Sequence, residues 1–182
     1  MRITIFGGSQ PKPGEAAYTQ ALQLGRMLGA AGHTVLTGGY IGTMEAVSRG
    51  AAEAGGHVIG VTCAEIEAWR PVRPNAWVQE EMRYPTIRQR LFALIELCDA
   101  ALALPGGVGT LTEISAMWTH LLSGAIPPRP LILIGAEWQL LITQFYEAFG
   151  EYIPQVQRRL LSFAPDVEEA VQKLSISIET LL

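Results

Sequence analysis

The feature that most constrains the fold is a regular alternation of short apolar runs with longer amphipathic segments. Each apolar run is bounded by glycine, proline or polar residues, as buried strands usually are. The five runs span 2–6, 33–38, 57–62, 99–104 and 130–135. Because strand, helix and parallel strand normally join in a right-handed crossover, the alternation predicts an α/β fold. We expect a doubly wound parallel sheet flanked by helices.

The segments between and after these runs carry apolar residues at helical spacing. We expect helices over 15–31, 42–55, 84–98, 109–122, 137–150 and 165–182, the last with Pro165 and Asp166 near its start. The longest stretch without such a pattern is 63–83, and long irregular segments in compact domains are often binding loops. With 182 residues and no linker, the chain is expected to form a single domain over residues 1–182.

Composition and charge argue against several classes of partner. The net charge is −4, so we expect no nucleic-acid partner. No apolar run reaches the roughly 18 residues that a membrane-spanning helix needs, so we expect no membrane partner. The N-terminus enters a strand without signal-peptide features, and the two cysteines form no motif, which predicts a cytoplasmic location. Hydrophobic residues make up 49% of the chain, which indicates surface hidden in an oligomer.

Three of the expected strands end in glycine-rich turns: FGGSQPKPG at 6–14, TGGYIGTMEA at 37–46 and LPGGVGTLTE at 104–113. The carboxyl ends of parallel strands meet at one edge of a sheet, where ligands bind. Glycine lets backbone amides approach a ligand, and a following helix N-terminus favours an anion. A single glycine turn can merely connect strand to helix, but three at one edge predict a phosphate site.

The ligand of this site is expected to be a small molecule. The first turn lacks the G-x-G-x-x-G dinucleotide fingerprint, and the chain has no Walker motif. A mononucleotide or a sugar phosphate therefore fits better than a dinucleotide, and we expect no cofactor. His33, His57 and His120 have no metal-ligand spacing to cysteine or carboxylate, so we expect no metal site.

Glu113 permits two readings from its spacing. Thr110 and Glu113 match a capping box, in which the glutamate accepts a hydrogen bond from a free backbone N–H of the helix start. In the other reading, a carboxylate one turn after the glycines faces the sugar of a bound nucleotide. There it could stabilise an oxocarbenium-like transition state or bind the attacking water.

Arginines gather in one short stretch. Five of the 13 Lys and Arg residues fall within 21 positions: Arg70, Arg73, Arg83, Arg88 and Arg90. Such a run often forms a solvated helix face. However, the chain is acidic overall, and guanidinium groups suit bidentate contacts with phosphate, so we include Arg88 among the candidate nucleotide contacts.

The sequence PGGVGTLTE at 105–113 matches P-G-G-x-G-T-x-x-E, the signature of the LONELY GUY (LOG) family, whose members were long mislabelled as possible lysine decarboxylases. ITIFGGS at 3–9 resembles the first strand and loop of the family. The stretch 37–61 resembles its second glycine loop, helix and third strand, and 88–107 resembles its arginine helix running into the signature. The resemblance covers roughly residues 2–135. Where the family has M-H-x-R-K, this chain has Ile-Arg-Gln-Arg-Leu at 87–91.

The resemblance implies a Rossmann-like fold and a homodimer with the active site close to its interface. It also implies hydrolysis of the N-glycosidic bond of a nucleoside 5′-monophosphate, of AMP or cytokinin ribotide type, to free base and ribose 5-phosphate. The catalytic residues of the family fall on Glu113 and Arg90. Its phosphate-binding positions fall on Gly8, Ser9, Gly38, Gly39, Gly42, Gly106, Gly107, Gly109 and Thr110.

A second hypothesis uses the same loops without catalysis. The chain would then bind or carry a phosphorylated small molecule, as a related molybdenum-cofactor carrier does, and Glu113 would act mainly as a cap. A pyridoxal-phosphate decarboxylase needs an active-site lysine for its Schiff base. The two lysines of this chain, Lys12 and Lys173, lie in the first loop and the terminal helix, so we reject that activity.

Overall fold

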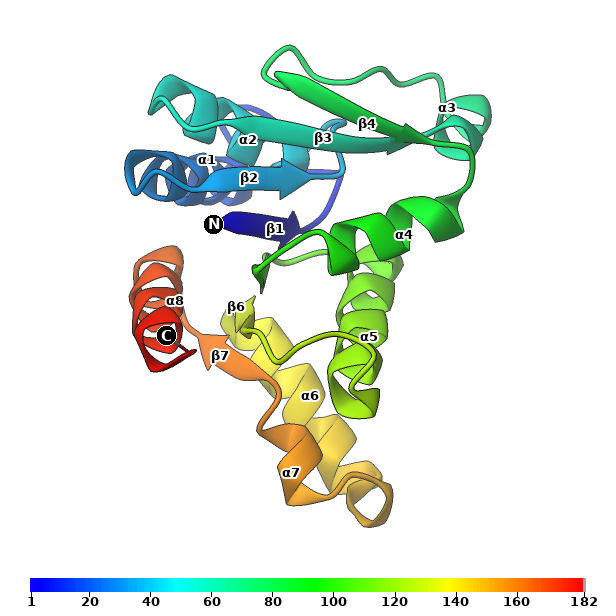
Figure 1. Cartoon of the computed structure of the whole chain (residues 1–182), viewed down its shortest axis with the longest axis vertical. Helices are drawn as coiled ribbons and strands as arrows, with labels where there is room; N and C mark the ends of the chain where they lie inside the picture. The colour runs from blue at the N-terminus through cyan, green and yellow to red at the C-terminus, as the bar shows by residue number, and fades with distance from the viewer. Residues whose placement is uncertain (182) are drawn as a thin grey trace.

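The computed structural model describes residues 1–181, which form one seven-stranded, wholly parallel sheet with helices on both faces (Figure 1). Its strand order is β4-β3-β2-β1-β5-β6-β7. The strands are β1 Arg2–Phe6, β2 Thr34–Thr37, β3 Val58–Cys63, β4 Glu80–Tyr84, β5 Ala100–Ala103, β6 Leu131–Ile134 and β7 Ser162–Ala164. The chain adds β2, β3 and β4 on one side of β1 and then returns to place β5 on the other. This order confirms the predicted doubly wound, Rossmann-like α/β fold.

The helices follow the strands in turn. They are α1 Ala16–Ala30, α2 Thr43–Glu53, α3 Ala64–Trp69, α4 Ile87–Glu96, α5 Val108–Ser123, α6 Ala136–Ala148, α7 Gln155–Arg158 and α8 Val167–Leu181, with a 3₁₀ turn, η1, at Gly150–Tyr152. All six expected helices are present, with ends that shift by up to three residues. Asp166 caps α8 by accepting a hydrogen bond from the backbone N–H of Glu169 at 2.8 Å. The last residue of the expected closing helix, 182, lies outside the described residues.

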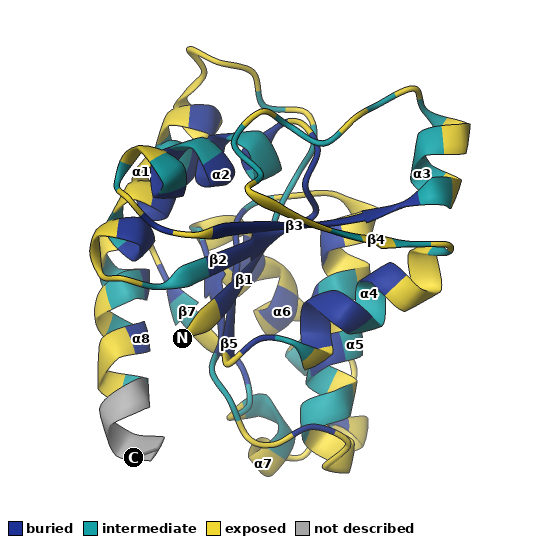
Figure 2. Ribbon diagram, turned by 45° about the horizontal axis from the view of Figure 1, so that its top comes forward, coloured by how far each residue is buried: buried dark blue, intermediate teal, exposed yellow. Residues whose placement is uncertain are grey.

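Two apolar layers enclose the sheet because successive strand residues point to opposite faces. Ile3 and Ile5 of β1 pack in one layer with α1, α2 and α8. Phe6 and the alternate residues of the other strands pack in the second layer with α4, α5 and α6. Figure 2 shows the buried residues concentrated in the central strands and on the inward faces of the helices. Helices therefore cover both faces of the central strands, and ligands can approach these strands only at their ends, whereas the edge strand β4 is largely exposed.

The segment 63–83, which we expected to be irregular, contains two elements. It holds the short helix α3 and the beginning of the edge strand β4, whose five residues pair with β3 from Glu80 to Tyr84. The strand β7 and the short elements η1 and α7 were also not predicted. Within residues 1–181, no helix is long and apolar enough to cross a membrane.

Candidate active site

The three glycine turns meet at the carboxyl edge of the sheet, where the strand order reverses between β1 and β5. The backbone N–H of Gly8, in the first turn, donates to the carbonyl of Pro105 in the third turn at 3.2 Å. The carbonyl of Gly8 accepts the hydroxyl of Thr43 at 2.9 Å and the backbone N–H of Thr43 at 3.0 Å, which ties the second turn to the first. One glycine thus joins all three loops at the position where doubly wound sheets bind ligands.

A cavity of about 300 Å³ opens at this junction. Its floor is the start of α5, where Gly107 precedes the first helical residue and Gly109 is the second. A methyl group built on Gly107 or Gly109 would meet no atom within 4 Å, so both positions border open space. The N-terminal amides of a helix lack intrahelical partners and attract anions. The cavity is lined by Gly7, Gly8, Ser9, Gln10, Tyr40, Met44, Ile66, Arg70, Arg90, Gly107, Val108, Gly109, Thr110 and Glu113.

Gly38, Gly39 and Gly42, which we predicted as phosphate contacts, do not line this cavity. All three are buried behind its wall. A Cβ on Gly38 would lie 1.9 Å from Nη2 of Arg90, and a Cβ on Gly42 would lie 2.5 Å from the carbonyl carbon of Ser9. The second turn therefore leaves room for the arginine and for the first turn to approach. Gly106 is exposed but is also absent from the lining, and a Cβ there would collide with the hydroxyl of Thr110.

Glu113 points into the cavity and is not a cap. The helix begins at Val108 with Gly107 as its N-cap, and no side chain caps it, so the capping-box interpretation of Thr110 and Glu113 is wrong. Its carboxylate lies 3.8 Å from Nη1 of Arg90, with only 14% of the side chain exposed. Burial raises the pKa of Glu113 to about 7, and the positive charge of Arg90 offsets only part of that rise. Near neutral pH this carboxyl group can therefore both hold and release a proton.

Arg90 reaches the cavity from α4 and is held on several sides. Its Nε donates to the carbonyl of Val61, at the middle of β3, at 2.7 Å. Its guanidinium carbon lies 5.9 Å from the ring centre of Tyr40, within cation–π range. The residue as a whole is 8% exposed. These contacts fix the guanidinium beside Glu113 without consuming its full hydrogen-bonding capacity.

Arg88, our other candidate on this helix, is not brought to the cavity. It is exposed and lies with Tyr84 and Phe92 along a separate hollow. Two residues along an α-helix are separated by about 200° of rotation, so Arg88 and Arg90 face opposite sides of α4. Only one of the two arginines can reach the ligand from this element.

The cavity is also lined by Tyr40, Ile66 and Arg70, which were not among the predicted site residues. Arg70 comes directly after α3 and donates from Nη1 to the hydroxyl of Ser9 at 3.4 Å. The sequence feature that could have identified Arg70 as a site residue is its position in a long segment rich in arginine. Tyr40 belongs to the second glycine turn. In the structure its hydroxyl donates to the carbonyl of Cys63 at 3.1 Å.

Neither lysine lines this cavity. Lys12 is exposed in the first loop, and Lys173 pairs with Glu169 at 2.6 Å on α8. Within residues 1–181, no group of three or more His, Cys, Asp or Glu side chains is placed to hold a metal ion.

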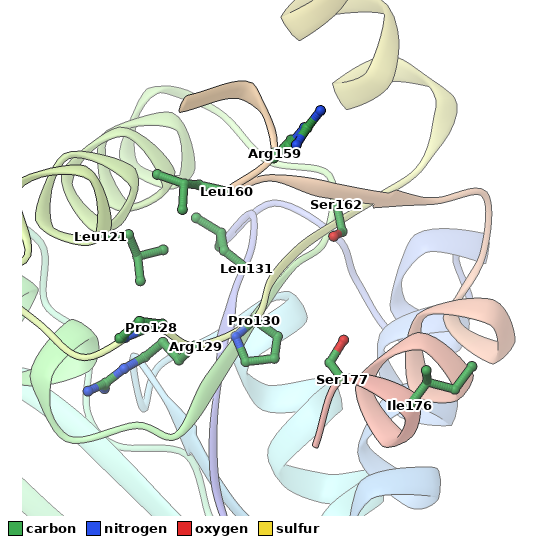
Figure 3. A pocket seen from close by; sticks show the side chains of 10 residues that line it. All are labelled: Leu121, Pro128, Arg129, Pro130, Leu131, Arg159, Leu160, Ser162, Ile176 and Ser177. Atoms are coloured by element: carbon green, nitrogen blue, oxygen red, sulfur yellow. The ribbon is translucent and has the colours of Figure 1, made fainter. Parts of the chain in front are cut away.

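A second hollow, of about 360 Å³, lies at the opposite end of the sheet (Figure 3). It borders the starts of β6 and β7, at Leu131 and Ser162, and contains no carboxylate. Arg129 in its wall already donates to the carbonyl of Cys98, and Arg159 directs its guanidinium away from the neighbouring labelled side chains. The cavity at the carboxyl edge is therefore the better candidate site, because an acid, an arginine and the start of a helix line it together.

Comparison with known proteins finds a family model described as "Possible lysine decarboxylase" that matches residues 44–174. A probable cytokinin riboside 5′-monophosphate phosphoribohydrolase, LOGL5 of Oryza sativa, is 30% identical across 95% of this chain and 71% of its own length. The LOG5 enzyme of Arabidopsis thaliana is 29% identical across 95% of this chain and 76% of its own. A pyrimidine/purine nucleotide 5′-monophosphate nucleosidase of Escherichia coli is 30% identical across 94% of this chain, but only 40% of that protein is covered.

Among solved structures, a molybdenum cofactor binding protein from Rippkaea orientalis superposes with a TM-score of 0.76 and 23% identity, covering 97% of this chain and 96% of that chain. The molybdenum cofactor carrier protein of Chlamydomonas reinhardtii gives 0.73 and 22%, with 98% of both chains covered. At these identities the likeness establishes the fold alone.

Proposed function

The chain belongs to the LOG family, and from that premise we propose that it is a nucleoside 5′-monophosphate phosphoribohydrolase. In this reaction water cleaves the N-glycosidic bond of an AMP-type or cytokinin ribotide substrate and releases the free base and ribose 5-phosphate. One observation carries the proposal: Glu113 lines the same cavity as the amides at the start of α5. That arrangement suits a ligand with a phosphate at one end and a reacting sugar carbon nearby.

The phosphate would sit over the turn at 107–110, where Gly107 and Gly109 leave the space open. Free amides of the first helical turn and the hydroxyl of Ser9 provide hydrogen-bond donors, and the helix dipole favours the negative charge. This placement fixes the sugar relative to Glu113, four residues after Gly109. Holding a substrate in the correct orientation is itself a large part of enzymatic rate enhancement.

Glu113 would act in its ionised form at the sugar. As the bond between C1′ and the base nitrogen breaks, positive charge develops on the sugar ring, and a buried carboxylate stabilises it strongly. The same carboxylate can accept a proton from the attacking water, whose oxygen bonds to C1′, and that proton then passes to the nitrogen of the departing base. Arg90 holds Glu113 in place, and its guanidinium offers only hydrogen-bond donors, so it does not serve as the base.

The test is incubation of the protein with AMP, GMP, CMP and cytokinin ribotides, followed by chromatography for free base. Removal of a positioned acid–base group typically costs about 10²- to 10⁴-fold in rate. We expect Glu113→Ala to lose base release to this extent while still binding ribose 5-phosphate. Glu147→Ala, an exposed carboxylate on α6, is the matched control and should keep full activity.

Equal turnover by wild type and Glu113→Ala would refute the role of Glu113. A wild-type protein that retains a phosphorylated ligand and never releases base would instead support the carrier function. The chromatographic assay distinguishes these results because it measures bond cleavage, whereas ribose 5-phosphate binding measures the phosphate site alone.

We further propose that the protein acts as a homodimer. Leu111, Leu141 and Phe145 form an apolar hollow between α5 and α6, and all three are substantially exposed. Val108, on the same helix as Leu111, is 82% exposed and also lines the active-site cavity. An apolar face that continues to the cavity suits an interface close to the active site.

A further inference from the structure

Arg70 occupies the wall of the cavity that faces the start of α5, and its surroundings leave part of its guanidinium without a partner. Nη1 donates to the hydroxyl of Ser9 at 3.4 Å, which is a long contact. Nε is buried and has no hydrogen-bond partner. A buried donor without an acceptor is costly, and such groups in native structures call for a specific explanation.

The other charged groups of the cavity are already engaged. Arg90 and Glu113 lie 3.8 Å apart, and Nε of Arg90 is bonded to the carbonyl of Val61. The ion pairs of the described residues do not include Arg70. Arg70 is therefore the cation in this cavity whose charge no carboxylate neutralises.

The helix that precedes Arg70, α3, packs little of its surface against the rest of the protein. No residue of α3 is buried, and Trp69, next to Arg70, is 79% exposed. The guanidinium carbon lies 5.8 Å from the ring centre of Trp69. The side chain of Arg70 is thus positioned by its contacts with Ser9 and with the indole of Trp69, rather than by a helix buried in the core.

We propose that Arg70 binds the phosphate monoester of the substrate from the wall opposite α5 and thereby selects nucleotides over unphosphorylated nucleosides. This inference rests on the proposed phosphoribohydrolase function and adds to it a residue outside the glycine signature. Phosphate oxygens would accept hydrogen bonds from the unpaired donors of Arg70. A guanidinium group presents two parallel donors to a phosphate, which an ammonium group does not. Ser9 would link the guanidinium to the first glycine turn, so that both walls grip one phosphoryl group.

The test compares Arg70→Ala and Arg70→Gln with Arg73→Ala, an exposed arginine three residues further along the same segment. The first readout is the equilibrium dissociation constant of ribose 5-phosphate, measured by calorimetry. A hydrogen-bonded charge contact typically accounts for about a ten- to hundredfold change in affinity. We expect both Arg70 variants to bind this much more weakly, and Arg73→Ala to bind as the wild type does.

The second readout is the steady-state kinetics with AMP and with adenosine. We expect KM for AMP to rise about ten- to hundredfold in the Arg70 variants, with kcat within about threefold of wild type and adenosine turnover unaffected. Arg70→Gln keeps a polar side chain but removes the charge and the guanidinium fork, and thermal melting shows whether each variant is folded.

Arg70 variants that bind ribose 5-phosphate as tightly as Arg73→Ala would overturn the inference. The binding experiment also separates this inference from the proposed activity. If the wild type releases no base, but loss of Arg70 still weakens ribose 5-phosphate binding, the phosphate role stands and the hydrolase does not.

Discussion

Among single residues, Glu113 is central to the proposed function because its carboxyl group is buried, where its ionised form is unfavourable. The pKa of Glu113 rises from 4.5 to about 7 on folding because its carboxyl group is withdrawn from water. The folded state therefore binds its proton more tightly than the unfolded state does. That contribution to stability is fully present below pH 4.5 and is lost as the pH rises through about 7.

Glu113→Gln should therefore stabilise the protein at alkaline pH while abolishing its activity. From the pKa shift of Glu113, the variant should gain about 3 kcal/mol in the free energy of unfolding at pH 8.5 and less than about 1 kcal/mol at pH 5. Urea unfolding at both pH values, at equal protein concentrations, measures the difference. A variant no more stable than wild type at pH 8.5 would show that the glutamate is not desolvated as described.

Glu113, Arg90 and the glycines at the start of α5 could be predicted from the sequence, but the roles of several other residues could not. The spacing at Thr110 and Glu113 fits a cap equally well, and only the start of α5 at Val108 rules the cap out. Gly38 and Gly42 were predicted to contact the phosphate. Their lack of a side chain instead leaves room for Arg90 and for the first turn. Arg70 was missed because nothing local marks which arginine of a cluster turns toward a cavity formed by residues 61 positions away.

At the scale of elements, α5 combines a structural task with a binding task. Gly109 lies in its first turn, where alanine would favour the helix by about 0.5–1 kcal/mol. A methyl group there meets no protein atom within 4 Å, but it would occupy the space left for the phosphate.

We expect Gly109→Ala to unfold at a higher temperature than wild type and to bind ribose 5-phosphate more weakly. Thr119→Ala, in an exposed position of the same helix, is the control: it should raise the helix propensity without changing affinity. Thermal melting and calorimetry measure the two effects. A Gly109→Ala variant that binds with wild-type affinity would place the phosphate elsewhere.

The central elements were predictable because fully buried parallel strands are continuous apolar runs. The edge strand β4 was not predicted because its sequence, EEMRY, is mostly charged. This strand lies at the edge of the sheet and pairs with one strand, β3. Charged residues are typical of edge strands, where they discourage pairing with other chains. The strand β7 has three residues, which is too short for a periodic pattern to be recognised.

At the scale of the whole molecule, we propose that a second copy of the chain covers the exposed apolar residues on α5 and α6. We expect the protein to be a dimer in solution and Phe145→Glu to convert it to a monomer, because a buried unpaired charge is incompatible with an apolar interface. Light scattering coupled to size-exclusion chromatography measures the mass. Thr19→Glu, on α1 at the opposite face of the sheet, should remain dimeric; a wild-type monomer would refute the proposed interface.

The arrangement of the whole sheet brings the phosphate turn and the acid together, so the most direct measurement is a crystal structure with ribose 5-phosphate bound. The account predicts phosphate oxygens within hydrogen-bond distance of the amides at 107–110, with the anomeric carbon beside the Glu113 carboxylate. A phosphate bound outside this cavity, or a sugar directed away from Glu113, would contradict it.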